Sequence, residues 1–433
     1  MKNNYLINEV IKNIKNGKKY LIAFSGGLDS SALLHILFYL KKKYFKNIKL
    51  RAIHINHNLN INSNIWEKKC SLFCKERNIK LIIKNVNITK KSNLEENARK
   101  LRYNIFKKII LKNEILLLAH HLQDQCETFF LALKRGSGPS GLSCMPLKKK
   151  NFFYILRPFL NINKKIIKKF VYENKIKYIE DDSNYNIKFD RNYLRLKILP
   201  LLEKRWPEFF LSISKSIFIC VNQEKIIYNF FKKKIIKIQN KKKALSINYL
   251  KKISLFKCFL LIRYWLNQFN INKISLKMIK TIWYEIALSN LNAKPKIKSK
   301  IYQINRYSNY IYLLPNMYNI KNIVMNWSLN EPLILPNNIG KLIISKTDGY
   351  ILQAPKKNQK VKIKFFLKGL YYIIGKKYSS NIKKIWKELG IAPWLRNRIP
   401  LLFYDDKFIS AIGVFNIKNN FLIKKKIIIK IIK

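Results

Sequence analysis

Short apolar runs alternate with longer amphipathic stretches over the first 120 residues of the chain. The runs have the length and β-branched character of buried strands, and apolar residues recur at helical spacing between them. The predicted strands are Tyr20–Phe24, Leu50–Ile55, Lys80–Val86 and Ile115–Ala119, and the predicted helices are Ser31–Leu40, Trp66–Arg77 and Leu94–Leu111. This rhythm predicts right-handed βαβ units and a doubly wound, mostly parallel sheet covered by helices on both faces.

The rhythm changes after Pro200. Apolar residues at three- and four-residue spacing predict a mainly helical region from Leu201 to about Glu285, and short apolar runs such as Tyr310–Leu314 predict strands beyond it. We therefore expect three parts in this α/β protein. They are a Rossmann-like domain over residues 1–215, a mainly helical middle domain over 216–345, and a small α+β domain over 346–433.

The composition adds a strongly basic charge to this picture. The 87 Lys and Arg residues against 23 Asp and Glu give a net charge of +64. Lys and Arg that neutralise phosphates release condensed counterions, so this charge favours a polyanionic partner. Lys, Asn, Ile, Tyr and Phe are all abundant, however, and all have A/T-rich codons, so we attribute roughly half of the excess to compositional drift. The charge supports nucleic-acid binding without establishing it.

The cysteines and the apolar runs limit the cellular setting. The six cysteines form no C-x-x-C pair, which argues against a zinc knuckle and against a thioredoxin-type redox site. The N-terminal segment lacks the apolar stretch of a secretory signal, and no uncharged apolar run reaches the roughly 18 residues of a membrane span. We expect a cytoplasmic protein with reduced thiols and no membrane segment.

The first motif with chemical content is Ser25-Gly26-Gly27-Leu28-Asp29-Ser30, between the first predicted strand and a helix. Free backbone N–H groups and the helix dipole favour an anion there, and the glycines let the backbone approach oxygen atoms. The serines can donate hydrogen bonds, and Ser30 or Ser31 can cap the helix. Gly-Gly alone fits an ordinary turn, but the whole string predicts a phosphate site. It is not a Walker A loop, because no Gly-Lys-Ser/Thr follows.

A second polar segment begins where the fourth predicted strand ends. His120, Asp124 and Glu127 are spaced i, i+4 and i+7, so we expect them on one helix face, where they would suit Mg²⁺ or an ammonium group. A solvated polar face is the alternative on spacing alone. Ligands of open α/β sheets bind beyond the carboxyl ends of the strands. We therefore expect the segment 25–30, the pair His54 and His57, and this segment to line one site.

These motifs resemble a known enzyme family. The first loop is similar to the pyrophosphate loop of the PP-loop (N-type) ATP pyrophosphatases. The second segment reads A-H-H-x-x-D-Q-x-E-T and continues as R-G-x-G-x-x-G-L, which resembles the tRNA(Ile)-lysidine synthetases. Other agreeing blocks are His54–His57, Glu96–Tyr103, Arg157–Leu160, Glu180–Asn184, Arg191–Arg195 and Gly390–Pro400. Two residues depart from the family pattern, which has Asp at the position of Gln123 and often Pro at that of Asp182.

The resemblance implies a ligase that adenylates the C2 oxygen of the wobble cytidine in tRNA(Ile) with a CAU anticodon. Free L-lysine then displaces AMP to give lysidine. The residues implied for ATP are Ser25, Gly26, Gly27, Leu28, Asp29, Ser30, His54 and His57, and those implied for Mg²⁺ are Asp124 and Glu127. The expected catalytic residues are Asp29, His120, Asp124, Glu127, Arg191 and Arg195, and the expected RNA or phosphate contacts are Arg99, Arg102, Arg135 and Arg396. The residues expected to bind or deprotonate the lysine ammonium are one or more of Asp124, Glu127 and Asp181.

Two other interpretations stay open at this stage. Another PP-loop enzyme, such as a tRNA thiolase or an amidating synthetase, is disfavoured because paired cysteines and a Cys-His nucleophile block are absent from the sequence. A tRNA-binding relative without catalysis is disfavoured by the intact loop and by His120, Asp124 and Glu127. We expect Trp394 in a core rather than stacked on RNA. The sequence leaves a homodimer open.

Overall fold

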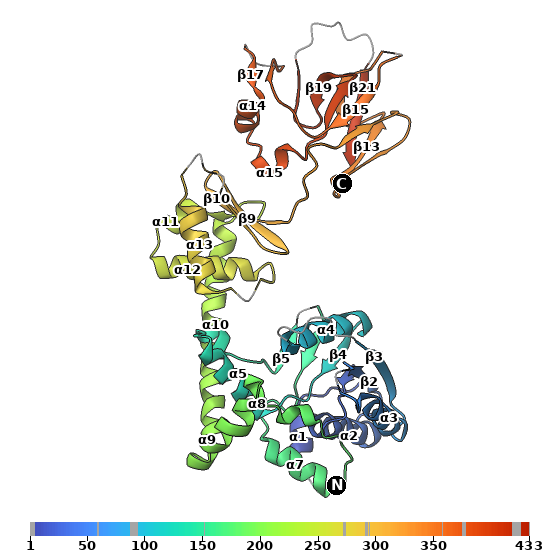
Figure 1. The fold of residues 1–433 in the computed structure, drawn as a ribbon, viewed down its shortest axis with the longest axis vertical. Coiled ribbons are helices and arrows are strands. Elements are labelled where there is room, and N and C mark those ends of the chain that lie inside the picture. Colours follow the sequence, from blue (N-terminus) through green and yellow to red (C-terminus); the bar gives the residue numbers. More distant parts are fainter. Residues whose placement is uncertain are drawn as a thin grey trace. The chain divides into compact units, whose positions relative to one another are not determined.

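The computed structural model describes residues 5–58, 60–86, 94–150, 152–271, 274–290, 293, 295–356, 358–374, 378–417 and 426–432 (Figure 1). The chain divides into two compact units, residues 1–229 and 230–433. Within the described ranges, no helix combines the length and the apolar character that crossing a bilayer requires.

A six-stranded sheet of order β3-β2-β1-β4-β6-β5 forms the centre of the first unit. β1 to β4 and β6 run parallel, and the edge strand β5 pairs antiparallel with β6. The chain moves outward from β1 first to β2 and β3 and then, on the other side, to β4 and β6. The expected doubly wound parallel sheet is confirmed. The strands are β1 (Lys19–Ala23), β2 (Lys49–Asn56), β3 (Lys80–Asn85), β4 (Glu114–Leu117), β5 (Lys148–Lys150) and β6 (Tyr154–Leu156).

Helices cover both faces of this sheet, with α4 on one side and α2 and α3 on the other (Figure 1). Successive side chains of β1 point to opposite faces of the sheet, so the strand contributes to two cores. Ile22 belongs to the core with Leu33 and Leu37 of α2, whereas Leu21 belongs to the core with Phe106 of α4. The helical elements are α1 (Tyr5–Ile11), α2 (Leu28–Lys43), α3 (Ser63–Lys75), α4 (Leu94–Ile109), α5 (Leu122–Lys134), α6 (Pro139–Leu142), α7 (Lys164–Glu173), η1 (Asp182–Tyr185), α8 (Asp190–Tyr193), η2 (Leu194–Ile198), α9 (Leu199–Arg205) and α10 (Phe209–Ile238).

The second unit begins with helices that pack beside a small antiparallel sheet of order β7-β10-β9-β8. Trp265 of α12 is fully buried there, and its indole N–H donates to the carbonyl of Lys243 over 2.9 Å. The elements are β7 (Leu245–Ser246), α11 (Ile247–Lys251), α12 (Leu255–Asn267), α13 (Leu276–Thr281), η3 (Ile282–Ala287), β8 (Lys296–Lys298), β9 (Tyr302–Tyr307) and β10 (Tyr310–Pro315).

The last part of the chain contains two antiparallel sheets, β11-β15-β18-β19-β20 and β12-β13-β21-β14, and the hairpin β16-β17. Ile363 of β15, Leu402 of β18 and Ile429 of β21 share one core, so the two sheets pack together. The elements are β11 (Val324–Asn326), β12 (Leu333–Leu335), β13 (Gly340–Ser345), β14 (Tyr350–Gln353), β15 (Val361–Lys364), β16 (Leu370–Tyr371), β17 (Ser380–Asn381), α14 (Ile382–Glu388), α15 (Pro393–Arg396), β18 (Leu401–Tyr404), β19 (Lys407–Ala411), β20 (Phe415–Asn416) and β21 (Lys426–Ile432).

The predicted strands and helices of the first 120 residues are all present, with ends that differ by a few residues. The sequence patterns did not predict β5, β6 or β21. Lysines interrupt the apolar run near the C-terminus, yet β21 pairs with both β13 and β14. Residues 422–425 and 433 of that run lie outside the described residues. The domain boundaries after residues 215 and 345 stay predictions.

The ionisation of His35 provides a test of the packing between α2 and α7. The His35 ring meets Phe170 edge-on with centroids 6.3 Å apart, and burial together with Arg77 lowers its pKa from 6.5 to about 4. Between these values the unfolded chain binds a proton that the folded chain excludes, so stability falls as the pH drops through this window. We expect H35Q to flatten the dependence of the thermal midpoint on pH between 7 and 4.5. An unchanged slope would contradict this origin.

Candidate active site

The predicted motifs gather at the carboxyl ends of β1, β2 and β4. Nδ1 of His54 lies 3.0 Å from the carbonyl oxygen of Phe24, which connects the end of β2 with the end of β1. Nε2 of His121, which follows β4, lies 3.5 Å from Oδ2 of Asp29 in α2. β1 and β4 are adjacent strands. From β1 the chain continues to β2 on one side, and from β4 it continues to β5 and β6 on the other. The crevice at such a switch point is where open α/β sheets bind ligands.

The loop between β1 and α2 is held by its own serines. The hydroxyl oxygens of Ser25 and Ser30 lie 3.1 Å apart, and the Ser30 hydroxyl donates to the carbonyl of Gly27 over 3.0 Å. The Ser31 hydroxyl donates to the carbonyl of Gly26 over 3.1 Å. The N-cap of α2 is Gly27, and no side chain caps the helix, so the expectation that Ser30 or Ser31 does so was wrong. The first N–H groups of α2 are thereby left for an anion.

Gly26 is a position that requires glycine. Its φ is +83°, and a Cβ atom there would lie 2.6 Å from Cδ1 of Ile179 and 2.7 Å from Sγ of Cys70. The N–H of Ile179 also donates to the Gly26 carbonyl over 2.9 Å. The loop is therefore supported from behind by a segment about 150 residues further along the chain.

Asp124 and Glu127 lie on one face of α5, as their spacing predicts, and two arginines bind them there. Nε of Arg191 donates to Glu127 over 2.5 Å, and its terminal nitrogen donates to Asp124 over 2.8 Å. Arg195 donates to both oxygens of Glu127, over 2.7 and 3.1 Å. Glu127 is fully buried, so its charge depends on these partners. We call these four residues the carboxylate–arginine cluster.

A π-helical turn brings the two arginines to the cluster. Arg191 belongs to α8, and Arg195 belongs to the π-helix η2 that follows directly. Between them, the Asn192 side chain donates to the carbonyls of Ser183 and Asn186, each over 3.0 Å. Widened turns of this kind are frequent at functional sites. The R-N-x-x-R block thus supplies two guanidinium groups and ties down the preceding loop.

The magnesium role that we expected for the paired carboxylates stays a prediction. The oxygens of Asp124 and Glu127 accept hydrogen bonds from nitrogen donors, and the described residues contain no group of three or more His, Cys, Asp or Glu arranged to hold a metal ion. Asp29 fits a cation better, because its Oδ1 is buried next to the loop and has no hydrogen-bond partner among the described residues. Magnesium prefers such carboxylate oxygens, usually together with substrate phosphates. The candidate magnesium ligand is therefore Asp29.

Helix α5 begins later than the spacing suggested, at Leu122. His120 precedes the helix and does not share the face of Asp124, so that part of the expectation was wrong. Burial, helped by the nearby Arg157, lowers the pKa of His120 to about 3, and in the described part of the chain its buried Nδ1 has no hydrogen-bond partner. His120 therefore contributes a neutral ring to the site.

His121 is a residue that the sequence analysis missed. It is the N-cap of α5. Its Nδ1 accepts from the N–H of Asp124 over 3.4 Å, and Oδ2 of Asp124 accepts from the N–H of His121 over 3.0 Å. Burial alone would lower the pKa of His121, but the carboxylates of Asp124 and Asp29 outweigh it and raise the pKa. The second His of A-H-H, three residues before Asp, has the spacing of a reciprocal cap and could have indicated this role.

The carboxylate of Asp124 is held in its charged form. Burial would raise its pKa, but His121 and Arg191 outweigh this effect and hold the pKa well below its usual range. Asp181, the third carboxylate considered for lysine, lies outside the carboxylate–arginine cluster. It accepts from the N–H of Ser183 over 2.9 Å as the N-cap of η1.

The other predicted site residues are more scattered. His57 is half-buried just beyond β2, and burial together with Arg102 lowers its pKa. Arg99 and Arg102 are exposed on α4, and Arg135 is exposed at the end of α5. Arg396 belongs to the second unit, where its Nε donates to the carbonyl of Ile391 over 3.0 Å.

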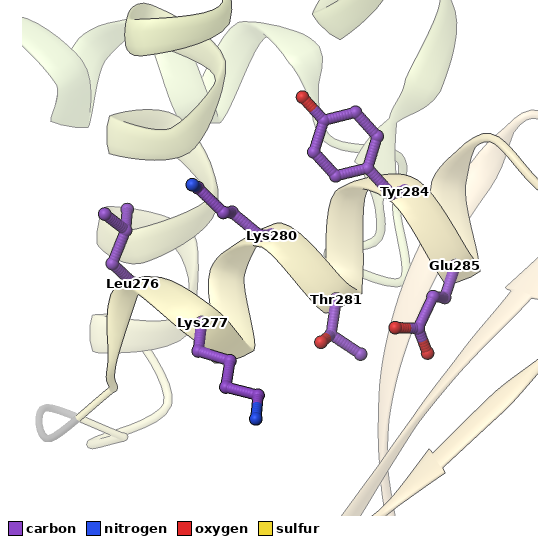
Figure 2. Close-up of a pocket in the computed structure, with 6 residues that line it drawn as sticks. All are labelled: Leu276, Lys277, Lys280, Thr281, Tyr284 and Glu285. Atoms are coloured by element: carbon purple, nitrogen blue, oxygen red, sulfur yellow. The ribbon is translucent and has the colours of Figure 1, made fainter.

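The second unit contains an aromatic cluster around Trp394 and a surface hollow. Trp394 packs against Tyr307 and Tyr312, with centroids 6.0 and 5.2 Å away, so its ring is engaged in packing. A hollow of about 350 Å³ lies along α13 and η3 (Figure 2). Its lining residues all come from one continuous helical segment, and they are Leu276, Lys277, Lys280, Thr281, Tyr284 and Glu285.

Comparison with known proteins covers nearly the whole chain. Three family models match: a PP-loop domain at residues 1–202, a TilS substrate binding domain at 245–312 and a TilS substrate C-terminal domain at 365–425. The tRNA(Ile)-lysidine synthase of Buchnera aphidicola subsp. Schizaphis graminum is 45% identical over 96% of this chain and 94% of the relative. The enzymes of the same name from Buchnera aphidicola subsp. Acyrthosiphon pisum and Serratia proteamaculans are 43% identical (96% of this chain, 94% of the relative) and 38% identical (96% and 95%).

The chain belongs to the tRNA(Ile)-lysidine synthase family. The resemblance of its motifs to that family is confirmed, and the PP-loop match identifies an ATP-using enzyme. The roles assigned to individual site residues stay predictions, which the geometry above refines.

Gln123, the departure from the family pattern at the site, has a structural role. Its side-chain amide donates to Oδ1 of Asn163 over 2.9 Å, and its carbonyl oxygen accepts from the N–H of Lys164 over 2.8 Å. Asn163 in turn caps α7 by accepting from Lys165. Gln123 therefore connects the first turn of α5 to the beginning of α7. Both of its side-chain hydrogen bonds are made there and not in the carboxylate–arginine cluster.

We expect Q123A to lower stability and to leave lysidine formation nearly intact. The substitution removes two hydrogen bonds, each worth about 1 kcal/mol net, so the thermal midpoint of the first unit should fall by about 4–8 °C. Q123E is the matched control, since it can still accept from Lys164 but cannot donate to Asn163, and its midpoint should fall less. A tenfold loss of activity in folded Q123A would instead place Gln123 in the catalytic machinery.

Proposed function

We propose that this chain joins L-lysine to C2 of the wobble cytidine of tRNA(Ile) with a CAU anticodon, using ATP and releasing AMP and pyrophosphate. The observation that carries the proposal is the family membership along the whole chain, together with an intact pyrophosphate loop beside the carboxylate–arginine cluster. The product is lysidine, which pairs with adenosine, so that the tRNA reads AUA.

In the first step we propose that the loop 25–30 receives the departing pyrophosphate. The C2 oxygen of cytidine attacks the α-phosphorus of ATP, and the bond to the bridging oxygen of pyrophosphate breaks. The N–H groups at the start of α2 and the two loop serines face the negative charge that develops on the leaving group. Asp29 is the residue that would hold Mg²⁺, which neutralises phosphate charge when bound.

In the second step the ε-amine of lysine attacks C2, and the C2–oxygen bond breaks to release AMP. Lysine carries charges of both signs, so the carboxylate–arginine cluster is complementary to it. We assign the lysine charges to Asp124 and Glu127 on one side and Arg191 and Arg195 on the other. The proton lost by the amine goes to a carboxylate of the site. Asp181 stays a candidate for accepting this proton. It lies outside the carboxylate–arginine cluster, whose two carboxylates are assigned to the lysine charges.

The basic side chains are proposed to hold the tRNA. Arg99, Arg102 and Arg135 are exposed in the catalytic unit and suit phosphates near the anticodon. In the second unit we propose that Lys277, Lys280 and Tyr284 of the α13 hollow, together with Arg396, contact the tRNA outside the anticodon. Methionine tRNAs share the three anticodon letters, so their rejection must use these outer contacts.

The decisive measurement is lysine incorporation. Purified protein is incubated with ATP, Mg²⁺, radiolabelled lysine and either tRNA(Ile)-CAU or initiator tRNA(Met). We expect label in the isoleucine tRNA alone, dependent on ATP and accompanied by AMP. The same assay on a chain lacking residues 361–433 tests the outer contacts, and unchanged discrimination and affinity would remove the last domain from that role. Pyrophosphate release without lysine transfer would indicate a different PP-loop reaction.

We expect Asp29→Ala to reduce lysidine formation by about 100-fold or more, because it removes a charge that is preorganised at the phosphates. The affinity for tRNA, measured by filter binding, should change less than twofold. Asp190→Ala is the matched control, since Asp190 is an exposed carboxylate that pairs with Lys134 and should not matter for catalysis. Equal activity of the two variants would refute the role of Asp29.

A further inference from the structure

His121 connects the pyrophosphate loop to the carboxylate–arginine cluster. Its side chain is 2% exposed, and its two ring nitrogens face different partners. Nδ1 accepts from the backbone N–H of Asp124. Nε2 lies 3.5 Å from Oδ2 of Asp29 and 3.6 Å from Oδ2 of Asp124. An accepting Nδ1 requires the proton on Nε2 in the neutral ring, and the charged ring carries it as well. An N–H group therefore faces Asp29 in either state.

A helix cap alone does not account for this arrangement. Ser, Thr, Asn and Asp are the side chains that cap helices best, and a short side chain would satisfy the N–H of Asp124 as well as Nδ1 does. A short cap could not extend to Asp29 in the neighbouring helix α2. The two oxygens of Asp29 also differ. Oδ2 lies near His121, whereas Oδ1 is buried and finds no hydrogen-bond partner within the described ranges.

We propose that His121 is a positioning residue for adenylation, which orients the Asp29 carboxylate at the start of α2 through Oδ2. This inference rests on the proposed function for the identity of the reaction, but it concerns pyrophosphate release, which can be followed separately. Lys164 is a further charged group near the ring, and His121 thus meets charges from α2, α5 and α7. The prediction is an effect on the first step that leaves the use of lysine unchanged.

Two substitutions separate the functions of the two ring nitrogens. The Oδ1 atom of Asn occupies the position of Nδ1, so H121N can keep the cap but loses the contact with Asp29. The Nε2 atom of Gln occupies the position of the ring Nε2, so H121Q can keep the contact but loses the cap. We expect H121N to reduce kcat for pyrophosphate release 10- to 100-fold, with KM for lysine unchanged and a thermal midpoint within about 2 °C of the wild type.

We expect H121Q to recover most of that rate, to within about fivefold of the wild type, although it unfolds at a lower temperature. A double-mutant cycle tests the route of the effect, because H121N should cost less than twofold more in the D29N background. Wild-type kcat in H121N would overturn the proposal, as would equal slowing in H121N and H121Q or full additivity with D29N. If the wild type releases pyrophosphate but forms no lysidine, the proposed function fails while the proposal for His121 is still tested.

Discussion

Glu127 is a carboxylate with no exposure to solvent, and a charge in that position is stable only when it is paired. Its partners come from 64 and 68 residues further along the chain. Removing one partner from such a pair typically costs about 3–5 kcal/mol. The position of α8 and η2 against α5 is therefore fixed by electrostatics as well as by apolar packing.

The same pairing determines the chemistry available at the sheet edge. Asp124 is held between Arg191 and His121, so it stays charged and both of its oxygens already accept hydrogen bonds. His121 is fixed in turn as the cap of α5 and lies next to Asp29 at the start of α2. A continuous set of polar contacts thus extends from the pyrophosphate loop to the arginines. In the proposed function the two half-reactions share this set, because the residues proposed for ATP and for lysine both contact His121 or Asp124.

The sequence predicted the parallel strands, the loop and the residues that gather around it, because each depends on local pattern and on the rule that strand ends share an edge. It could not predict the long-range partners. Nothing local indicates that Arg191 binds Glu127, or that Gln123 is used at the start of α7. The start of α5 also changed the roles of two histidines. The spacing placed His120 in the helix, but the helix begins at Leu122, so His121 is its cap. β21 was missed because Lys426 and Lys430 interrupt its run of isoleucines, and only its pairing with β13 and β14 reveals it as a strand.

The chain carries a net charge of +64, whereas the buried carboxylates of the site are paired with arginines. Within the described ranges the buried acidic residues are Glu114, Asp124 and Glu127, and each is paired with arginine rather than lysine. A planar guanidinium can bind both oxygens of a carboxylate and loses less hydration than an ammonium group. The electrostatic interactions of surface lysines are screened over about 8 Å at physiological salt. Drift toward lysine can therefore increase the attraction for tRNA without disturbing the pairs that hold the site together.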